Sequence, residues 1–388
     1  MPTLDTIDWI KTYSDPPAIY RALREACAPA PSCQGVSALD YGADPSGLRD
    51  SSPALNAAIA AAAGRPVILP AGKFRLDAPL RFSPTGSAHV PGLTLLGAGQ
   101  HLTILQVRHS QGAAILLDQT PDRSYRFGQY GMLAGFTLEG MNVASGPAIR
   151  VSGAWRYQLE DLTVRYFKGN AIEVPWRGDI HTNPDAWQTT LRMSRVTLDY
   201  NQGWGVYSEA ATGFLLNADD LMVRLNGAGG LNLTGSARIV GGAIAWNYGP
   251  GVVIRKQQPS GANPQISILE RIEFDGNTDA HLKVEASARL AVRSSRFISQ
   301  PISGVFKPLR AVVIGNNNPG PEGAVTGVTF DQCAFRATMG YAWTGFSFLH
   351  RGSYSGITID MPLWITYDPS LQRKYGPEMV PSLVTLRE

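Results

Sequence analysis

The chain has 388 residues, of which 44% are hydrophobic and 17% charged. This composition supplies a large core and excludes a disordered acidic tail. The formal net charge of +3 argues against a protein that coats nucleic acid. Glycine contributes 41 residues, above its usual share of about 7%, which favours many tight turns over a helical bundle.

Residues 1–35 are predicted to form a helical lead-in. Ser14, Asp15 and Pro16 supply cap and first-turn chemistry, and the Pro-rich stretch 29–32 ends the helical spacing. The first residues show no basic region followed by an apolar run, and no window approaches the ~18 apolar residues of a membrane span. We therefore expect no membrane contact, and a cytoplasmic or virion-associated protein that is secreted only by a non-classical route.

A short helix is predicted over residues 53–63. Asp50 and Ser51 offer caps, Pro53 suits the first helical turn, and Gly64 ends an alanine-rich run. This helix is expected to cover the N-terminal end of the structure that follows.

From residue 65 onward, the helical period gives way to short apolar alternations separated by Gly, Asn and Pro. Eight of these segments align on one apolar position, called the anchor below. Successive anchors lie 21 to 34 residues apart, as in a stacked repeat with variable loops. The anchors are Leu138, Val164, Leu198, Val223, Ile244, Phe274, Phe297 and Phe330.

A second short strand generally follows each anchor strand, after a turn that often holds an asparagine. Stacked amide side chains can bond to the backbone and to one another, so these asparagines are interpreted as structural. They are Asn201, Asn226, Asn247 and Asn277.

The repeat predicts a β-solenoid over residues 36–340, with residues 341–388 as a tail that packs on its C-terminal end. Inward-facing apolar side chains are expected to form one continuous core. These are Leu162, Val164, Val196, Leu198, Leu221, Val223, Ile272 and Phe274.

Three stretches near the N-terminus resemble a known family. They are Leu39–Asp44 with Gly47 and Asp50 behind it, Val67–Phe74, and Leu93–Gly99. They are similar to the opening segment of pectate-lyase-like right-handed parallel β-helices, a group with polysaccharide lyases, polygalacturonase-like hydrolases, alginate epimerases and phage tail-spike depolymerases. The resemblance implies an all-β, single-stranded right-handed parallel β-helix with a short N-terminal capping helix, and a poly- or oligosaccharide as its ligand.

Two catalytic motifs of that group are incomplete in this chain. Alginate epimerases and related lyases carry YG-x-D-x-H, whereas Trp204–Glu209 reads WGVYSE and lacks the aspartate and the histidine. The polygalacturonase set is also broken, because Asn277–Asp279 and Asp219–Asp220 occur in the wrong order and no GHG follows. Epimerase activity is therefore disfavoured.

Outward side chains at equivalent positions of successive coils form columns, with neighbouring strands about 5 Å apart. The first polar column follows the anchors, and its alternating charges fit solvated cross-strand pairs. It contains Glu139, Arg165, Asp199, Arg224, Ala245, Asp275 and Asp331. The second column runs through the second strands as Glu173, Tyr207, Asn232, Val253 and Lys283, flanked by Glu209, Thr234, Arg255 and Glu285, with His281 on its other side.

The second column holds the candidate catalytic residues, because acid–base chemistry on a sugar needs groups of different pKa. For β-elimination, the groups that remove the C5 proton of a uronate and neutralise its carboxylate are sought among Tyr207, Arg255, Lys283 and His281. For hydrolysis, Glu173 and Glu209 would flank the glycosidic bond. The same column also fits an exposed face of mixed charge.

The long segment 175–190 is predicted to overhang this column. Aromatic faces suit the apolar faces of sugar rings, although two tryptophans in a long loop can equally pack the loop onto the coil. The predicted substrate-binding residues are Trp176, His181 and Trp187 in this loop, and Asn232, Trp204 and Asp199 on the coils.

The sequence thus predicts a carbohydrate-active enzyme, a polysaccharide lyase or a glycoside hydrolase. The basic residues of the second column favour β-elimination of an acidic glycan. The alternative is a non-catalytic, glycan-binding phage-type spike, and a homotrimer is expected in that case. No metal site, nucleotide or nucleic-acid partner is predicted; Ca²⁺ between carboxylates and a uronate is the one ion that the chemistry would accept.

Overall fold

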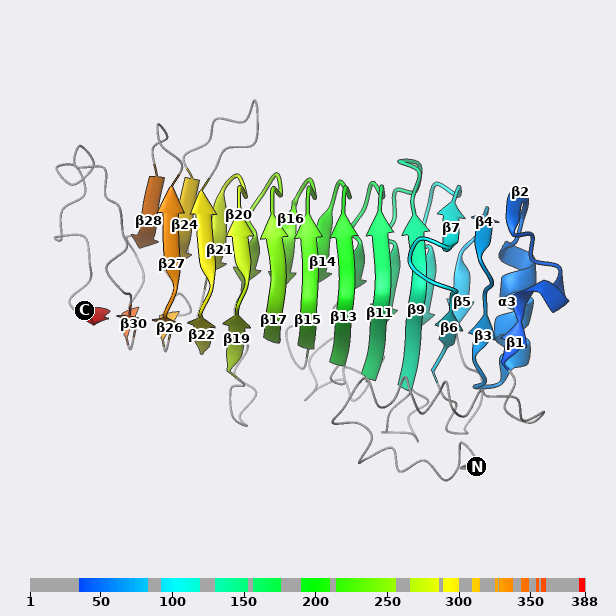
Figure 1. Ribbon diagram of the computed structural model, residues 1–388, viewed down its shortest axis with the longest axis horizontal. Helices are drawn as coiled ribbons and strands as arrows, with labels where there is room; N and C mark the ends of the chain where they lie inside the picture. The colour runs from blue at the N-terminus through cyan, green and yellow to red at the C-terminus, as the bar shows by residue number, and fades with distance from the viewer. Residues whose placement is uncertain are drawn as a thin grey trace, which may run out of the picture.

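The computed structural model shows an elongated rod of stacked coils (Figure 1). It describes residues 35–82, 92–118, 130–152, 156–175, 190–209, 214–255, 266–285, 289–299, 309–314, 325–326, 328–337, 343–348, 354–355, 357–360 and 384–387. The helical lead-in predicted for residues 1–35 lies outside these ranges except for its last residue.

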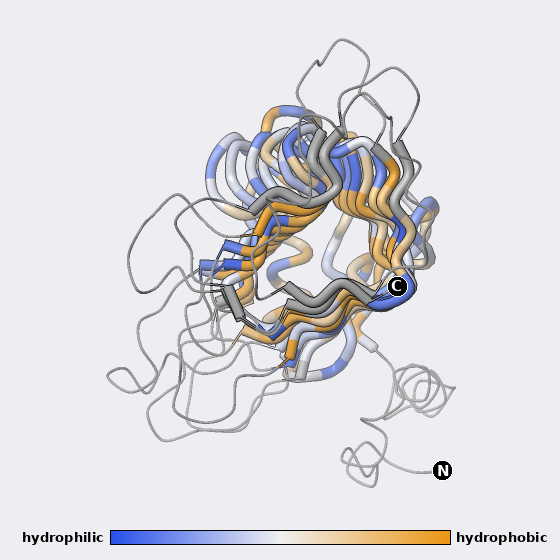
Figure 2. Tube along the Cα trace, turned by 90° about the vertical axis from the view of Figure 1, so that its left-hand side faces the viewer, coloured by the Kyte–Doolittle hydropathy of each residue, from blue (hydrophilic) through white to orange (hydrophobic). Residues whose placement is uncertain are grey.

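The described strands form a 19-stranded sheet, a 10-stranded sheet and a two-stranded pair, and every strand pairing is parallel. Figure 2 looks along the rod, where successive coils superpose on three faces around a common interior. The all-β parallel β-helix predicted from the repeat and the resemblance is confirmed.

The first sheet contains β1 (Val36–Ser37), β2 (Ser46–Asp50), β3 (Val67–Ile68), β4 (Gly72–Leu76), β6 (Thr94–Leu96), β7 (Thr103–Val107), β9 (Tyr130–Glu139), β11 (Arg156–Arg165), β13 (Thr190–Asp199), β15 (Leu215–Arg224), β17 (Ser236–Ala245), β19 (Ser267–Glu270), β20 (Glu273–Asp275), β22 (Leu290–Arg293), β23 (Arg296–Ser299), β26 (Val328–Asp331), β27 (Ala334–Ala337), β30 (Ile357–Asp360) and β31 (Val384–Arg387). The second sheet contains β5 (Leu80–Phe82), β8 (Ile115–Asp118), β10 (Ile149–Ser152), β12 (Ile172–Val174), β14 (Trp204–Ser208), β16 (Gly229–Leu233), β18 (Val252–Ile254), β21 (Ala280–Val284), β24 (Leu309–Ile314) and β28 (Trp343–Phe348). The pair consists of β25 (Val325–Thr326) and β29 (Tyr354–Ser355).

The predicted capping helix is α3 (Ser52–Ala62), preceded by a short 3-10 turn, η2 (Ala38–Tyr41). Asp50 Oδ1 accepts a hydrogen bond from the Ser52 backbone N–H at 2.9 Å and fixes the start of the helix. Leu55 is fully buried and faces the first coils, and α3 lies at the N-terminal end of the rod (Figure 1). The helix therefore closes that end.

The ten-residue strands of the first sheet bend in the middle at a residue with positive φ. The bend residues are in register from coil to coil, and they are Gly135, Asp161, Arg195, Asp220 and Gly241, with φ of 72°, 48°, 53°, 53° and 73°. Each long strand therefore lies on two faces of the rod. The second sheet supplies the third.

Seven of the eight anchors occupy one register position, from Leu138 through Phe297. The prediction for the eighth anchor is wrong. Phe330 pairs with Val292, before the bend, whereas the residue that pairs with Phe297 is Phe335. The eight residues predicted to point inward are all buried, including those around the bend.

The four asparagines form a buried ladder, as predicted. Asn201 donates from Nδ2 to Asn226 Oδ1 at 3.0 Å, Asn226 to Asn247 at 3.0 Å, and Asn247 to Asn277 at 2.8 Å. Each Nδ2 also donates to a backbone carbonyl of the preceding coil. The ladder thus ties five coils together at one corner.

Strand pairing continues past residue 340. β28 pairs with β24, β30 with β26, and β31 with β30, so these segments extend the coils instead of packing on their end. The stretch 362–379 of the expected tail lies outside the described residues.

Candidate functional site

The second polar column is in register as predicted. Glu173, Tyr207, Asn232, Val253 and Lys283 pair successively across the second sheet. Their strand neighbours point into the core, so the column lies on the outer face.

The column is not one continuous open groove. Asn232 and Val253, at its middle, are buried at 1% and 3% exposure. Glu173 is held by Arg150 at 3.6 Å and by the Asn170 amide at 3.2 Å, and Lys283 lies 2.5 Å from Asp279. The glutamate and the lysine therefore lie at two separate ends, each with a local partner.

Arg255 and Tyr207 remain close together near the middle of the column. The guanidinium carbon of Arg255 lies 5.8 Å from the centre of the Tyr207 ring. Glu209, one residue beyond β14, is exposed. Its backbone N–H donates a hydrogen bond to the Val174 carbonyl oxygen at 2.8 Å. Trp204, at the start of β14, packs over Gly229 of the next coil.

His281 does not lie beside the column on the surface. Its side chain is fully buried between Phe274 and Phe297, with ring centres 6.3 and 6.1 Å away, and Nδ1 lies 3.1 Å from the Asn277 amide. Burial lowers the pKa of His281 to about 3. Gly251 is the equivalent residue of the preceding coil, and a Cβ there would also meet Asn277, so this position faces the interior. The prediction of His281 as a catalytic surface residue is corrected.

Asp199 lies on the first sheet, away from the second column. It is 5% exposed and ion-paired with Arg224 at 3.3 Å, and burial raises the pKa of its carboxyl group. The residues of the first column from Glu139 to Asp275 pair successively across the first sheet, as predicted. Asp331 is not part of this column, because it pairs with Arg293 on the other side of the bend. Trp176, His181 and Trp187 lie outside the described residues.

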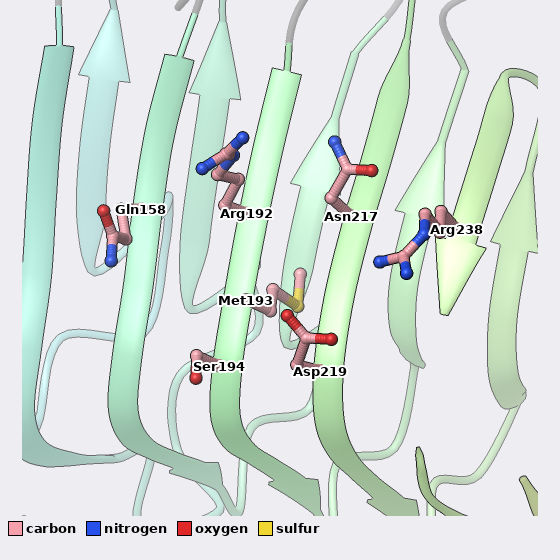
Figure 3. A pocket seen from close by; sticks show the side chains of 7 residues that line it. All are labelled: Gln158, Arg192, Met193, Ser194, Asn217, Asp219 and Arg238. Carbon is pink, nitrogen blue, oxygen red and sulfur yellow. The ribbon is translucent and has the colours of Figure 1, made fainter. Parts of the chain in front are cut away.

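A pocket that the sequence reasoning missed lies on the first halves of the long strands. Figure 3 shows Asn217 and Asp219 on β15, between Arg192 on β13 and Arg238 on β17. Its volume is about 280 Å³. The two arginines are two strands apart, about 10 Å along the sheet. The lining residues are Gln158, Arg192, Met193, Ser194, Asn217, Asp219 and Arg238.

The register explains how this pocket, called the arginine–aspartate pocket below, is built. Gln158, Arg192, Asn217 and Arg238 form one outward column, six residues before the anchors of their coils. Glu160, Ser194 and Asp219 form the next column, four residues before the anchors. A constant offset from the anchors would have found both columns in the sequence.

The carboxylates near the pocket differ in their contacts. Glu160 is 4% exposed, pairs with Arg195 at 2.5 Å and accepts from the Gln158 amide at 3.1 Å. Asp161 also binds Arg195 at 2.6 Å, and its hydrogen bonds raise the pKa of the guanidinium. Asp219 is exposed, and within the described part of the chain no ion pair joins it. Asp219 is therefore the carboxylate best placed to meet a ligand.

Within the described ranges, no three His, Cys, Asp or Glu side chains are grouped so that they could hold a metal ion. No helix in those ranges is both long and apolar enough to cross a membrane.

Comparison with known families places the chain. The family described as "Rhamnogalacturonase A/epimerase, pectate lyase-like" matches residues 35–258, more than half of the sequence. The chain belongs to this family. Membership confirms the resemblance noted in the first coils. The family name joins a rhamnogalacturonase with an epimerase, so it does not select one reaction.

Solved structures that are similar to this chain include a phage tailspike, an epimerase module and a glucanase. The Acinetobacter phage vb_AbaP_AS12 gp42 tailspike has a TM-score of 0.50 and 11% identity over 84% of this chain and 62% of the tailspike. The Azotobacter vinelandii mannuronan C-5 epimerase AlgE4 A-module has a TM-score of 0.47 and 14% identity over 91% of this chain and 100% of the module. The catalytic unit of a GH87 α-1,3-glucanase from Streptomyces thermodiastaticus strain HF3-3 has a TM-score of 0.46 and 17% identity. The match covers 92% of this chain and 68% of the glucanase unit. No curated protein sequence matches the chain. At 11% identity, the match to the tailspike supports the fold alone.

Proposed function

We propose that the protein is a carbohydrate-active enzyme that binds an acidic poly- or oligosaccharide in the arginine–aspartate pocket and cleaves it there. The observation that carries the proposal is one exposed carboxylate, Asp219, between Arg192 and Arg238 on the neighbouring strands. Guanidinium groups bind carboxylates through paired hydrogen bonds, so a uronate is the sugar that this pocket would favour.

The reaction that fits these groups best is β-elimination. Asp219 takes the C5 proton of the uronate, the electron pair forms the C4–C5 double bond, and the C4–oxygen bond breaks. A proton from solvent goes to the departing oxygen. Arg192 and Arg238 bind the sugar carboxylate and stabilise the negative charge that develops on it.

Hydrolysis by paired carboxylates has less support. Glu160 lies two strands from Asp219, but it is buried and bound to Arg195. Glu173, on the other sheet, is bound to Arg150 and Asn170. The Tyr207–Arg255 pair is the competing location for elimination on the second sheet.

The proposal is tested by incubating the purified full chain with a panel of acidic and neutral polysaccharides. Two signals are read, the ultraviolet absorbance of unsaturated uronates and new reducing ends. Both signals together, on acidic polysaccharides only, support elimination. Reducing ends alone would show hydrolysis, and neither signal across the panel would indicate a non-catalytic glycan-binding spike.

The location is tested with two variants. Arg238→Ala is expected to raise KM for the acidic substrate, because it removes a guanidinium from the pocket, while Tyr207→Phe should leave turnover unchanged. The reverse result would move the site to the second sheet.

A further inference from the structure

A strip of exposed and half-buried aromatic and apolar side chains follows the long strands at the corner between the two sheets. Its members come from four successive coils, directly after β11, β13, β15 and β17, with one further tyrosine beside the last of them. This aromatic strip consists of Tyr166, Tyr200, Leu225, Trp246 and Tyr248.

The backbone presents these side chains outward in an unusual conformation. Tyr166, Tyr200, Leu225 and Trp246 have φ of 61°, 54°, 56° and 54°. This left-handed region favours glycine and asparagine and costs roughly 1–2 kcal/mol for other residues. Residues of this size, repeated on four coils of one corner, point to a role of the side chains themselves.

The rings are accessible and close to one another. Tyr200, Trp246 and Tyr248 are 46%, 40% and 48% exposed. The rings of Tyr166 and Tyr200 have centres 5.5 Å apart, one strand spacing, and are tilted by 35°. From Tyr166 to Trp246 the strip spans three strand spacings, about 14 Å. This row of three rings and Leu225 offers apolar surface to a sugar chain that lies along the rod.

The charges beside the strip are cationic where solvent reaches them. Arg165 pairs with Glu139 and Arg224 with Asp199, but the arginine side chains are 35% and 39% exposed, and the carboxylates are 13% and 7% exposed. Arg165 also lies over the Tyr166 ring at 5.2 Å. The accessible part of each ion pair is therefore mainly the arginine side chain.

We propose that the aromatic strip is a non-catalytic binding site for an acidic glycan, with sugar faces stacked on the rings and carboxylates near Arg165 and Arg224. The strip is separate from the arginine–aspartate pocket, because the second half of each long strand lies between them. The proposal therefore does not depend on cleavage in that pocket.

Two other occupants fit the strip less well. A second copy of the chain would need an interface of about 1,000 Å² or more, whereas the strip is narrow and bordered by the exposed polar residues Lys168 and Gln202. Nucleic acid also stacks on aromatic rings, but it favours a strongly basic surface, and the whole chain carries a net charge of only +3.

The test measures binding by fluorescence anisotropy on the full chain that carries Asp219→Asn, which prevents turnover in the proposed pocket. The probes are labelled oligogalacturonate and oligomannuronate, with a labelled dextran oligosaccharide as the neutral probe and oligo-dT as the nucleic-acid probe. The strip variant adds Tyr200→Asn and Trp246→Asn. Asparagine tolerates the left-handed conformation, so the melting temperature should be unchanged or higher. The matched control is Tyr41→Asn, since Tyr41 is 41% exposed and lies far from the strip on η2.

The proposal predicts that at least one acidic oligosaccharide binds, that the strip variant weakens its binding at least tenfold, and that the control leaves it unchanged. It is overturned if neither acidic probe binds, if the strip variant binds like the control, or if dextran binds equally well. Strip-dependent binding of oligo-dT in preference to the sugars, or a loss of self-association as the only effect, would also overturn it. If the wild-type chain cleaves no polysaccharide but the strip still binds an acidic oligosaccharide, the proposed function is wrong and the proposal for the strip stands.

Discussion

Replacing Asn226 with alanine removes four hydrogen bonds from the centre of the asparagine ladder. Asn226 Nδ2 donates to Leu198 O and to Asn247 Oδ1, both at 3.0 Å. Asn226 Oδ1 accepts from the backbone N–H and from Nδ2 of Asn201 at 3.2 and 3.0 Å. Asn226 is fully buried, so water has no ready access to the partners left behind.

Each buried hydrogen bond contributes about 1 kcal/mol net, and an unsatisfied buried partner costs about 1–3 kcal/mol. We therefore expect Asn226→Ala to lower the free energy of unfolding by about 4 kcal/mol, measured by urea unfolding with circular dichroism. The matched control is Asn217→Ala on the pocket surface. This substitution is expected to change the free energy of unfolding by less than about 0.5 kcal/mol. A loss below about 1 kcal/mol for Asn226→Ala would refute the idea that the ladder ties the coils together.

Two further predictions concern buried positions. Burial lowers the pKa of His281 from 6.5 to about 3, so the unfolded chain binds this proton first as the pH falls. The free energy of unfolding should therefore lose about 1.4 kcal/mol per pH unit through this residue between about pH 6.5 and 3. His281→Leu should remove that part of the slope in urea unfolding at several pH values, and an unchanged slope would contradict the placement of His281. A Cβ at Gly131 would overlap the buried Tyr157 ring, so Gly131→Ala should cost about 1–3 kcal/mol, and a neutral effect in the same assay would show that the ring can move.

The repeat could be predicted from the sequence because each coil leaves a local signal. Anchors such as Val164 and Leu198 alternate with polar residues, and Asn201 and Asn226 recur at one place in the turn. Residues at equal offsets from an anchor share a column, so the second column could be aligned correctly from Glu173 to Lys283. The capping helix was also predictable from local signals, because Pro53 suits a first helical turn and Gly64 follows the alanine-rich run.

The errors occurred where the coil departs from simple alternation. The bend residue shifts the register, and the motif around Phe330 matched the wrong side of the bend, which also misplaced Asp331. His281 looks like a surface residue by alternation, but its strand begins at a corner that faces the core. No sequence pattern shows that Asn232, in the middle of a polar column, is buried.

The central claim is that an acidic polysaccharide reacts in the arginine–aspartate pocket. The most direct measurement compares kcat of Asp219→Asn with kcat of Asp220→Asn on the acidic polysaccharide that gives unsaturated products. Both residues are exposed neighbours on β15, but only Asp219 lines the pocket. Loss of a general base lowers the rate by about 10²- to 10⁴-fold, so Asp219→Asn should lose at least about 100-fold, while Asp220→Asn keeps the wild-type rate. Equal rates for the two variants would contradict the claim.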